Sequence, residues 1–417
     1  MKTGIHMLVT VVLGGTFACG DSAGGPGPGG PPGTLAGPDV MMTAVTEDVY
    51  TVGAYMGEDW ESFGLLADVA FDGAGNAHIV DMREHRIVVV APDGSFVRLV
   101  GGPGEGPGEL RTPSALHVYG DGGYVVAGVS AIEVFAPGGE HLRRMPASAI
   151  SGGSPSWDAK SLPDGSFVST VFRFDLERAR RDLPQLDPPG RAIEVFPIEH
   201  GNPETLYTAW ELPDEGAGRR SAARSSSDGT SRLSAGRAFE PGLHFDVISD
   251  GRLAVVDSIG YRIKLIARDG RVVGAVERPI APLAVTEAMR DAQRERYRAR
   301  EVPSNVGIFR VERETVDRMT FADEVPVIAN IAVDWEDRIW VERTGEDGTG
   351  PGPTDIVTPE GGYIGTLPAD GVRIPSAFGP DGLMAYIETD EVGIQVVRVI
   401  RLNSLQPRPQ GGPDDPG

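Results

Sequence analysis

The chain of 417 residues has almost no cysteine and very little lysine. Cys19 is the single cysteine, so no disulfide can form within the chain. Lysine occurs only at Lys2, Lys160 and Lys264, and the formal net charge is −22. Because proteins that bind nucleic acid contact phosphates through clustered lysine and arginine, this composition argues against a nucleic-acid partner.

Several motifs that would indicate an enzyme are also missing. The histidines beyond the N-terminal segment form no HxH or HxxxH pair, which removes the usual zinc-binding spacing. No GxSxG sequence marks a nucleophilic serine. The glycine-rich segment 101–110 (GGPGEGPGEL) is interrupted by Pro103 and Pro107, and no Lys-Ser or Lys-Thr follows it. It therefore does not match a phosphate-binding loop.

Residues 1–18 have the pattern of an export signal, with a short basic start, an apolar run (MLVTVVL) and a small-residue cleavage region. The apolar run is too short for a permanent membrane-spanning helix. The position of Cys19 resembles that of the lipid-modified cysteine in bacterial lipoproteins, although Thr16 and Phe17 depart from the usual leucine and small residue. Cleavage after Ala18 by an ordinary signal peptidase is the alternative.

The segments at both ends of the remaining chain are poor in apolar residues. Residues 19–40 are rich in glycine and proline and predict a disordered tether. Residues 403–417 predict a disordered tail for the same reason. We therefore expect an exported protein of the cell envelope, in the periplasm or at the outer membrane, whose membrane contact is a lipid on Cys19.

A hairpin phrase built on Asp-Gly or an equivalent pair recurs in one register along the chain. It appears as FDGAGNAHIVD (71–81), LPDGSFVST (162–170), ISDGRLAVVD (248–257), WEDRIWVE (335–342) and GPDGLMAYIE (379–388). The alternating apolar residues after each turn indicate a strand, turn and strand. A second hairpin follows most of the phrases, so each unit predicts a four-stranded sheet. Several such sheets in one chain indicate a β-propeller.

The spacing of the turns predicts six blades in residues 41–402. The markers are Gly75, Gly122, Gly165, Gly251, Asp337 and Gly382. The two widest gaps contain 195–242 and 281–327, which lack paired hairpins, so we interpret them as insertions. A helix is expected in an insertion near 283–320. The last blade lacks an outer strand, and residues 48–56 can supply one and close the ring. The predicted fold is an all-β propeller of four-stranded antiparallel blades.

Two segments resemble the NHL-type repeat of bacterial six-bladed propeller lipoproteins. VDMREHRI (80–87) and VDSIGYRI (256–263) are similar to its Asp-x4-Arg-Ile phrase, and the glycine-rich segment 101–110 resembles one common in that family. The resemblance implies the fold and export rather than an activity. In this interpretation Asp81 with Arg86, and Asp257 with Arg262, hold the turn between the second and third strands of a blade.

The insertions are expected on one face of the propeller. Loops that enter the innermost strands and loops that join second to third strands share a face, and the long insertions belong to those two classes. Because binding residues on rigid scaffolds concentrate in loops, this face is predicted to bind a protein, peptide or glycan without catalysis.

Four polar residues fall at the start of an innermost strand, seven positions before the turn markers. They are Asp68, Asp158, His244 and Asn330, whereas blades 2 and 6 have Ala115 and Pro375 there. These side chains are candidate ligands of a divalent cation such as Ca²⁺. Six-bladed lactonase and esterase propellers also hold such ligands in their channels, so a metal-dependent hydrolase or lyase is the alternative function. Polar side chains at a wet channel mouth equally need no ligand.

Overall fold

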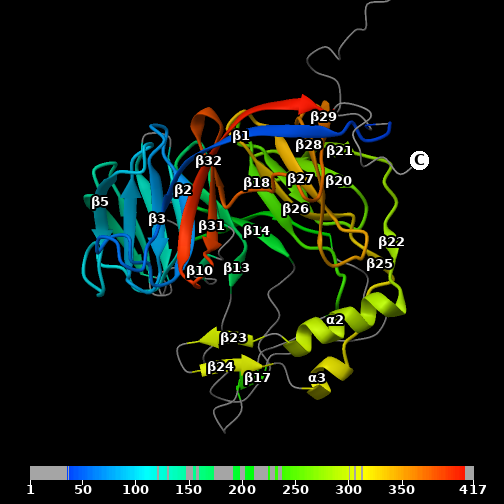
Figure 1. Cartoon of the computed structure of the whole chain (residues 1–417), viewed down its shortest axis with the longest axis horizontal. Coiled ribbons are helices and arrows are strands. Elements are labelled where there is room, and N and C mark those ends of the chain that lie inside the picture. The colour runs from blue at the N-terminus through cyan, green and yellow to red at the C-terminus, as the bar shows by residue number, and fades with distance from the viewer. Residues whose placement is uncertain are drawn as a thin grey trace, which may run out of the picture. The chain divides into compact units, whose positions relative to one another are not determined.

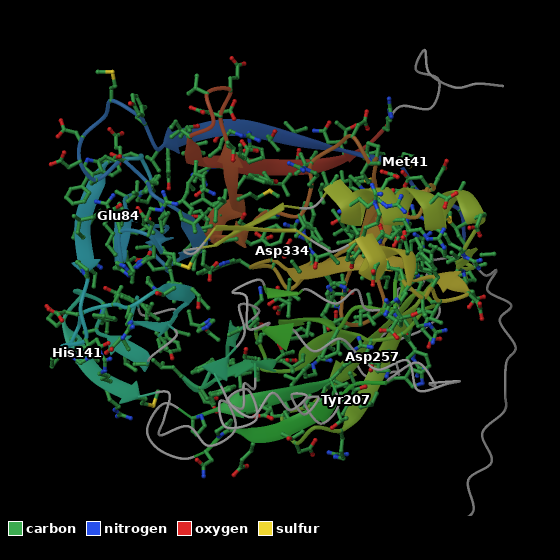
Figure 2. The ribbon with its side chains drawn as sticks, turned by 90° about the horizontal axis from the view of Figure 1, so that it is seen from below. Met41, Glu84, His141, Tyr207, Asp257 and Asp334 are labelled. Atoms are coloured by element: carbon green, nitrogen blue, oxygen red, sulfur yellow. The ribbon has the colours of Figure 1, made fainter. Side chains whose placement is uncertain are left out.

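The computed structural model describes residues 35, 37–119, 122–128, 131–146, 154–155, 159–172, 191–197, 202–210, 224–225, 231–232, 237–299, 301–304, 307–310 and 313–408. Within this part of the chain, six four-stranded antiparallel sheets surround a central channel (Figures 1 and 2). This arrangement confirms the predicted six-bladed β-propeller.

Each blade is numbered in chain order and described from its innermost strand outward. Blade 1 consists of β2 (Leu66–Phe71), β3 (Ala77–Asp81), β4 (Arg86–Val90) and β5 (Phe96–Gly101). Blade 2 consists of β6 (Pro113–Val118), β7 (Tyr124–Gly128), β8 (Ala131–Phe135) and β9 (His141–Pro146). Blade 3 consists of β11 (Lys160–Ser161), β12 (Phe167–Ser169), β14 (Ala192–Phe196) and β15 (Glu204–Thr208).

The remaining blades follow the same order. Blade 4 consists of β18 (His244–Val247), β19 (Leu253–Val256), β20 (Arg262–Ile266) and β21 (Val272–Glu277). Blade 5 consists of β26 (Ile328–Val333), β27 (Ile339–Thr344), β28 (Pro351–Val357) and β29 (Tyr363–Leu367). Blade 6 consists of β30 (Ala377–Phe378), β31 (Leu383–Thr389), β32 (Gln395–Pro407) and β1 (Met42–Val52), and the short 3-10 helix η2 (Pro380–Gly382) lies in its first turn.

In the part of the chain that the structure describes, short elements outside the four-stranded sheets form four two-stranded sheets and two helices. The sheets pair β10 (Ser154–Pro155) with β13 (Val171–Phe172), β16 (Arg224–Ser225) with β17 (Ser231–Arg232), β22 (Leu283–Ala284) with β25 (Glu324–Val325), and β23 (Glu301–Ser304) with β24 (Gly307–Arg310). The helices are α2 (Glu287–Ala299) and α3 (Arg313–Asp317), and both lie in the insertion expected near 283–320. No helix in the described ranges is long and apolar enough to cross a membrane.

The repeated turn explains why these segments form hairpins in one register. In blade 3, Asp164 Oδ1 accepts hydrogen bonds from the backbone N–H and the hydroxyl of Ser166, and Gly165 has φ 86°. Glycine reaches this left-handed conformation without a steric penalty. In blade 5 the same position holds Asp337 with φ 61°. Aspartate tolerates this conformation better than most residues, so the turn survives the replacement.

The ring is closed by β1, which forms the outer strand of blade 6 as predicted. It begins earlier than the expected 48–56 and pairs with β32 from Met42 opposite Pro407 to Val52 opposite Val397. Strand β32 therefore continues beyond residue 402, into residues that were expected to belong to the disordered tail. Residues 403–407 extend the ladder because their backbone groups pair with the first residues of β1.

The two turn-holding pairs inferred from the NHL-like phrases behave differently. Asp81 accepts a hydrogen bond from the Glu84 N–H inside the turn between β3 and β4, and its Oδ2 lies 3.6 Å from Arg86 Nη2, as expected. The same carboxylate also accepts hydrogen bonds from the N–H groups of Gly64 and Leu65, in the loop before β2. The Asp257–Arg262 pair is a wrong prediction. Asp257 pairs instead with Lys264, and Arg262 points to Glu277 on the neighbouring strand.

The surroundings of Asp257 explain why it does not pair with Arg262. Asp257 Oδ1 lies 2.8 Å from Lys264 Nζ, and its Oδ2 accepts hydrogen bonds from the Tyr207 hydroxyl and the Trp210 N–H of blade 3. Figure 2 shows Tyr207 and Asp257 side by side. The carboxylate is fully buried, so its partners must be close and numerous, and they come from a segment about fifty residues earlier.

Candidate functional site

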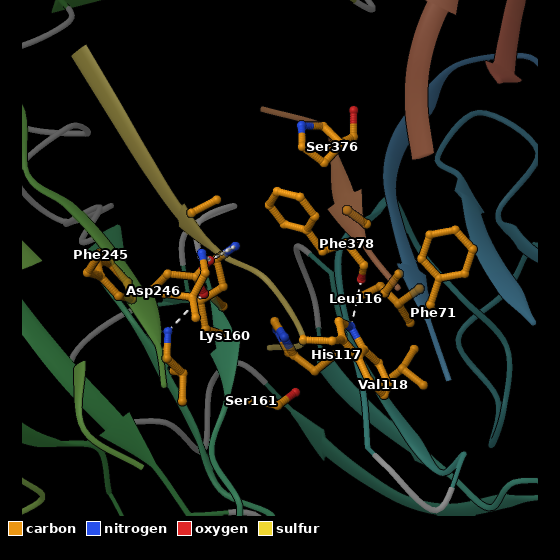
Figure 3. Close-up of a pocket in the computed structure, with 18 of the residues that line it drawn as sticks. Phe71, Leu116, His117, Val118, Lys160, Ser161, Phe245, Asp246, Ser376 and Phe378 are labelled. Atoms are coloured by element: carbon orange, nitrogen blue, oxygen red, sulfur yellow. Dashed lines mark hydrogen bonds and ion pairs between the residues drawn. The ribbon is translucent and has the colours of Figure 1, made fainter. Parts of the chain in front are cut away.

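The innermost strands of the six blades line a channel with a volume of about 760 Å³. Residues from all six strands contribute to it, and Figure 3 shows part of the lining. Three of the four predicted site residues, Asp68, His244 and Asn330, line this channel. The fourth, Asp158, lies outside the described residues, as does the proposed lipid-attachment residue Cys19. The register count therefore identified one common cavity for the three described residues.

Asp68 connects two neighbouring blades through backbone groups. Its Oδ1 accepts a hydrogen bond of 2.8 Å from the N–H of Val69, and its Oδ2 accepts one of 2.8 Å from the N–H of Leu116 in blade 2. Burial raises the pKa of Asp68 to about 6, against the opposing effects of these hydrogen bonds and of Lys160. Both carboxylate oxygens thus stabilise the junction of β2 and β6.

Asn330 has a related role in blade 5. Its Oδ1 accepts a hydrogen bond of 2.9 Å from the N–H of Ile331. The strand register shifts immediately before both Asn330 and Asp68, between Ile328 and Asn330 and between Leu66 and Asp68. A shift of this kind is a β-bulge, which leaves a backbone group outside the regular ladder. The two polar side chains therefore satisfy backbone donors beside bulges.

The structure does not test the expected cation site as a whole, because Asp158 lies outside the described residues. In the described ranges no group of three or more histidine, cysteine, aspartate or glutamate side chains is arranged to hold a metal ion. Of the predicted ligands, Asp68 and His244 are the two described residues of these types, so Ca²⁺ binding stays a prediction. Oxygen ligands at the mouth would fit Ca²⁺ chemically, but the oxygens of Asp68 already accept backbone hydrogen bonds.

The sequence analysis missed three charged or titratable residues that lie two positions further along the innermost strands. They are His117 on β6, Lys160 on β11 and Asp246 on β18, and all three line the channel (Figure 3). The strand register shows that the three residues occupy the same position in their blades. Each pairs with the residue of the second strand that lies three positions after the turn marker: His117 with Val125, Lys160 with Val168, and Asp246 with Ala254. The same turn-based count, continued by two residues, would have found them.

Asp246 repeats the inter-blade role of Asp68 one level deeper in the channel. Its Oδ1 accepts a hydrogen bond of 2.8 Å from the N–H of Val247, and its Oδ2 accepts one of 2.9 Å from the N–H of Val333 in blade 5. Lys160 Nζ lies 3.7 Å from Asp246 Oδ2. The Lys160 side chain is 40% exposed on the channel wall.

His117 is buried beside Lys160 and remains neutral at physiological pH. Its ring stacks on Phe167 of blade 3 at a centroid distance of 5.3 Å. Burial, together with the positive charge of Lys160, lowers the pKa of His117 to about 3. Its Nε2 atom is buried and has no hydrogen-bond partner among the described residues.

The opposite side of the channel is small and apolar at the same level. Blades 5, 6 and 1 place Ala332, Ala377 and Ala70 where blades 2, 3 and 4 place the three polar residues. Phe71 and Phe378 extend this apolar wall, and Trp335 donates a hydrogen bond to the Phe378 carbonyl between blades 5 and 6. At this level the channel is therefore polar on one side and apolar on the other, whereas Asp68 and Asn330 add polar groups at the start of the innermost strands of blades 1 and 5.

Two insertions meet in a small subdomain, which we call the cap and define as the described residues of 231–243 and 281–325. Ala238 of the first insertion forms a parallel bridge with Phe321 of the second. Ala238 also packs with Val316 and Met319 in a separate buried cluster. The cap leads directly into β18 and β26, so it lies on the face where the innermost strands begin (Figure 1).

The helix α2 lies against the rim of blade 5 rather than in the propeller core. Arg296 Nη1 donates a hydrogen bond of 3.3 Å to the carbonyl of Thr349, in the turn between β27 and β28. No residue of α2 is buried, and its arginines pair with its own acidic residues, as at Arg294 with Asp291. This turn belongs to the expected insertion 343–353, so the described loops of both predicted classes meet on one face.

Comparisons with known proteins assign no family to this chain. No family model matches the chain, and no curated protein matches its sequence. Similar solved structures include a member of the DUF4221 family from Bacteroides vulgatus, with 11% identity, a TM-score of 0.48 and coverage of 89% of this chain and 100% of that one. An exported-protein candidate from Bacteroides fragilis has 10% identity, a TM-score of 0.47 and coverage of 89% and 98%.

A gluconolactonase from Xanthomonas campestris is a further similar structure, with 13% identity, a TM-score of 0.40 and coverage of 88% of this chain and 98% of that one. At these identities the similarity concerns the propeller fold alone. The function must therefore be argued from the residues of this chain.

Proposed function

We propose that this protein is an envelope-tethered, noncatalytic propeller that binds a protein, peptide or glycan ligand through its loop-rich face. The observation that carries the proposal is the cap, in which two insertions far apart in the chain pack together beside the channel opening. Because these insertions pack around their own buried cluster, they have a defined structure. Loops with a defined structure on a rigid scaffold are suited to recognition of a ligand.

The chemistry of the channel supports a binding role. Lys160 lies 3.7 Å from Asp246 on one wall, and Ala332, Ala377 and Ala70 line the opposite wall at the same level. Ligand sites commonly combine an apolar lining with a few placed polar groups. His117 is neutral and its Nε2 is buried, and Asp68 uses both carboxylate oxygens on backbone groups. These contacts favour binding over acid–base catalysis.

Defined ligand arrays test this proposal. The purified full chain is probed on a printed glycan array and a peptide array, and every positive probe is measured again with two variants. Deletion of 286–300, which removes α2, and Lys160→Met in the channel are each expected to weaken binding at least tenfold. Arg271→Met, in the β20–β21 turn of the opposite face, is the charge-matched control and should bind as the wild type does.

Circular dichroism must show the same β content in all variants. A probe that binds both loop-face variants as tightly as the wild type contradicts the proposal.

The alternative function is a metal-dependent hydrolase or lyase at the channel mouth. It is favoured by one observation, that Asp68, His244 and Asn330 line the same channel. If the purified protein retains one cation per chain, this result favours the alternative function over the noncatalytic one.

A further inference from the structure

The segment before β1 is not a free tether in its last residues. Leu35 donates its N–H to the carbonyl of Glu277 at 2.8 Å, and its side chain packs on the apolar cluster between blades 4 and 5. Val40 donates its N–H to the Tyr363 hydroxyl at 3.0 Å, and the Val40 carbonyl accepts from the N–H of Thr366 at 2.9 Å. Residues 35–40 had been expected to be disordered, and the described ones instead dock on the outer strands β21 and β29.

Asp39 is the electrostatic centre of this contact. Its Oδ1 lies 2.9 Å from Arg278 Nη2, and its Oδ2 lies 2.5 Å from Arg343 Nη2. The two arginines come from blades 4 and 5, so one carboxylate joins both sides of the seam between these blades. Arg278 also lies over the ring of Tyr363 at 4.5 Å, which fixes the orientation of its guanidinium group.

The arginines also share an acidic partner inside the protein. Asp355 is fully buried, and its Oδ2 lies 2.8 Å from Arg278 Nη1, while its Oδ1 lies 3.6 Å from Arg343 Nη2. With Asp39 docked, two arginines face two aspartates and the cluster is neutral. Without Asp39, two arginines face one buried carboxylate, which leaves an unbalanced positive charge. The seam is therefore an anion site whose occupant is Asp39.

The docked segment lies at the rim from which the cap begins. Arg343 opens the insertion 343–353 and pairs with Ile328 at the start of β26. Glu277, which accepts the hydrogen bond from Leu35, is the last residue of β21, and the chain continues from it into the cap.

We propose that the described residues of 35–40 form a strap, locked by Asp39 in the Arg278–Arg343 site, that holds the N-terminal end of the described chain against the seam between blades 4 and 5.

Hydrogen exchange of the full soluble chain tests the lock. Asp39→Asn is expected to speed exchange of the Thr366 amide about tenfold, the factor that corresponds to a loss of about 1.4 kcal/mol in local stability. Asp39→Glu, which keeps the carboxylate, should restore most of the protection. Asp48→Asn is the matched control, because Asp48 lies in β1 and pairs only with exposed Arg398. Equal exchange in the wild type and Asp39→Asn overturns the strap.

Discussion

Replacement of Asp246 tests whether the polar residues of the channel hold the blades together. The Asp246 carboxylate accepts hydrogen bonds from the N–H groups of Val247 and Val333, and Lys160 lies nearby. Asp246→Ala leaves both N–H groups without this acceptor at a site where the carboxylate is 8% exposed. Hydrogen bonds to charged groups contribute about 1.5–3 kcal/mol each. Because water in the channel can replace part of this loss, we expect Asp246→Ala to lower the free energy of unfolding by about 3 kcal/mol.

Asp246→Asn should have a smaller effect, because the amide keeps one acceptor oxygen. We expect about half the loss seen with alanine. Urea unfolding followed by tryptophan fluorescence and by circular dichroism measures both variants, and agreement of the two signals checks for a two-state transition. Asp48→Asn, at an exposed ion pair, should change the free energy of unfolding by less than about 1 kcal/mol. A similar value for Asp246→Ala would refute the inter-blade role.

Four further outcomes are expected. Burial raises the pKa of Asp68 from an ordinary 3.8 to about 6. Asp68 therefore contributes fully to the free energy of unfolding below about pH 4, and this contribution of at most about 3 kcal/mol is lost as the pH rises through 6. In urea unfolding at different pH values, Asp68→Asn should not show this loss. Burial lowers the pKa of His117 from 6.5 to about 3, so its contribution is present above pH 6.5 and is lost as the pH falls toward 3; His117→Phe, which keeps the stack on Phe167, should unfold at lower pH than the wild type. Elemental analysis of protein dialysed against Ca²⁺ should find a bound cation that Asp158→Ala removes if the predicted ligand set holds one, and no bound cation in the wild type removes that prediction. Mass spectrometry of the membrane fraction should find a lipid mass on the N-terminal peptide, and Cys19→Ser should abolish it; a mature chain that begins at unmodified Cys19 would instead indicate ordinary cleavage after Ala18.

The fold was predictable because its signal is local and repeated. Each turn places an aspartate or glycine at a position with positive φ, and the residues that follow alternate between the two faces of a strand. Six copies in one register determine the blade number, even where Asp337 replaces the glycine. The insertions could be recognised by the loss of this alternation.

The channel residues were only partly predictable, because the start of an innermost strand is not marked in the sequence. The count ended at Asp68 and Asn330, which sit at β-bulges, and a bulge shifts the register by one residue. The neighbouring level with Lys160 and Asp246 needed the strand pairing to be known. Contacts between blades were the least predictable. Asp257 contacts Tyr207 and Lys264, although Arg262 is nearer to it in the sequence and pairs with Glu277 instead.

The strap illustrates the same limit at the N-terminus. Glycine and proline around Asp39 correctly indicate that the segment has no core of its own. Composition contains no information about Arg278 and Arg343, which lie more than two hundred residues later in the chain. The carboxylate of Asp39 and the hydrogen bonds of Leu35 and Val40 all join this segment to residues that are distant in the sequence.

Closure of the ring by β1 and β32 also sets the order in which the protein can be assembled. Strand β1 precedes all the other described strands of the propeller, and its partner β32 is the last of them. Until β32 has been made, the edges of β1 and β31 have nothing to pair with, and unpaired strand edges favour aggregation. Blade 6 can therefore be completed only after every other described blade has been made.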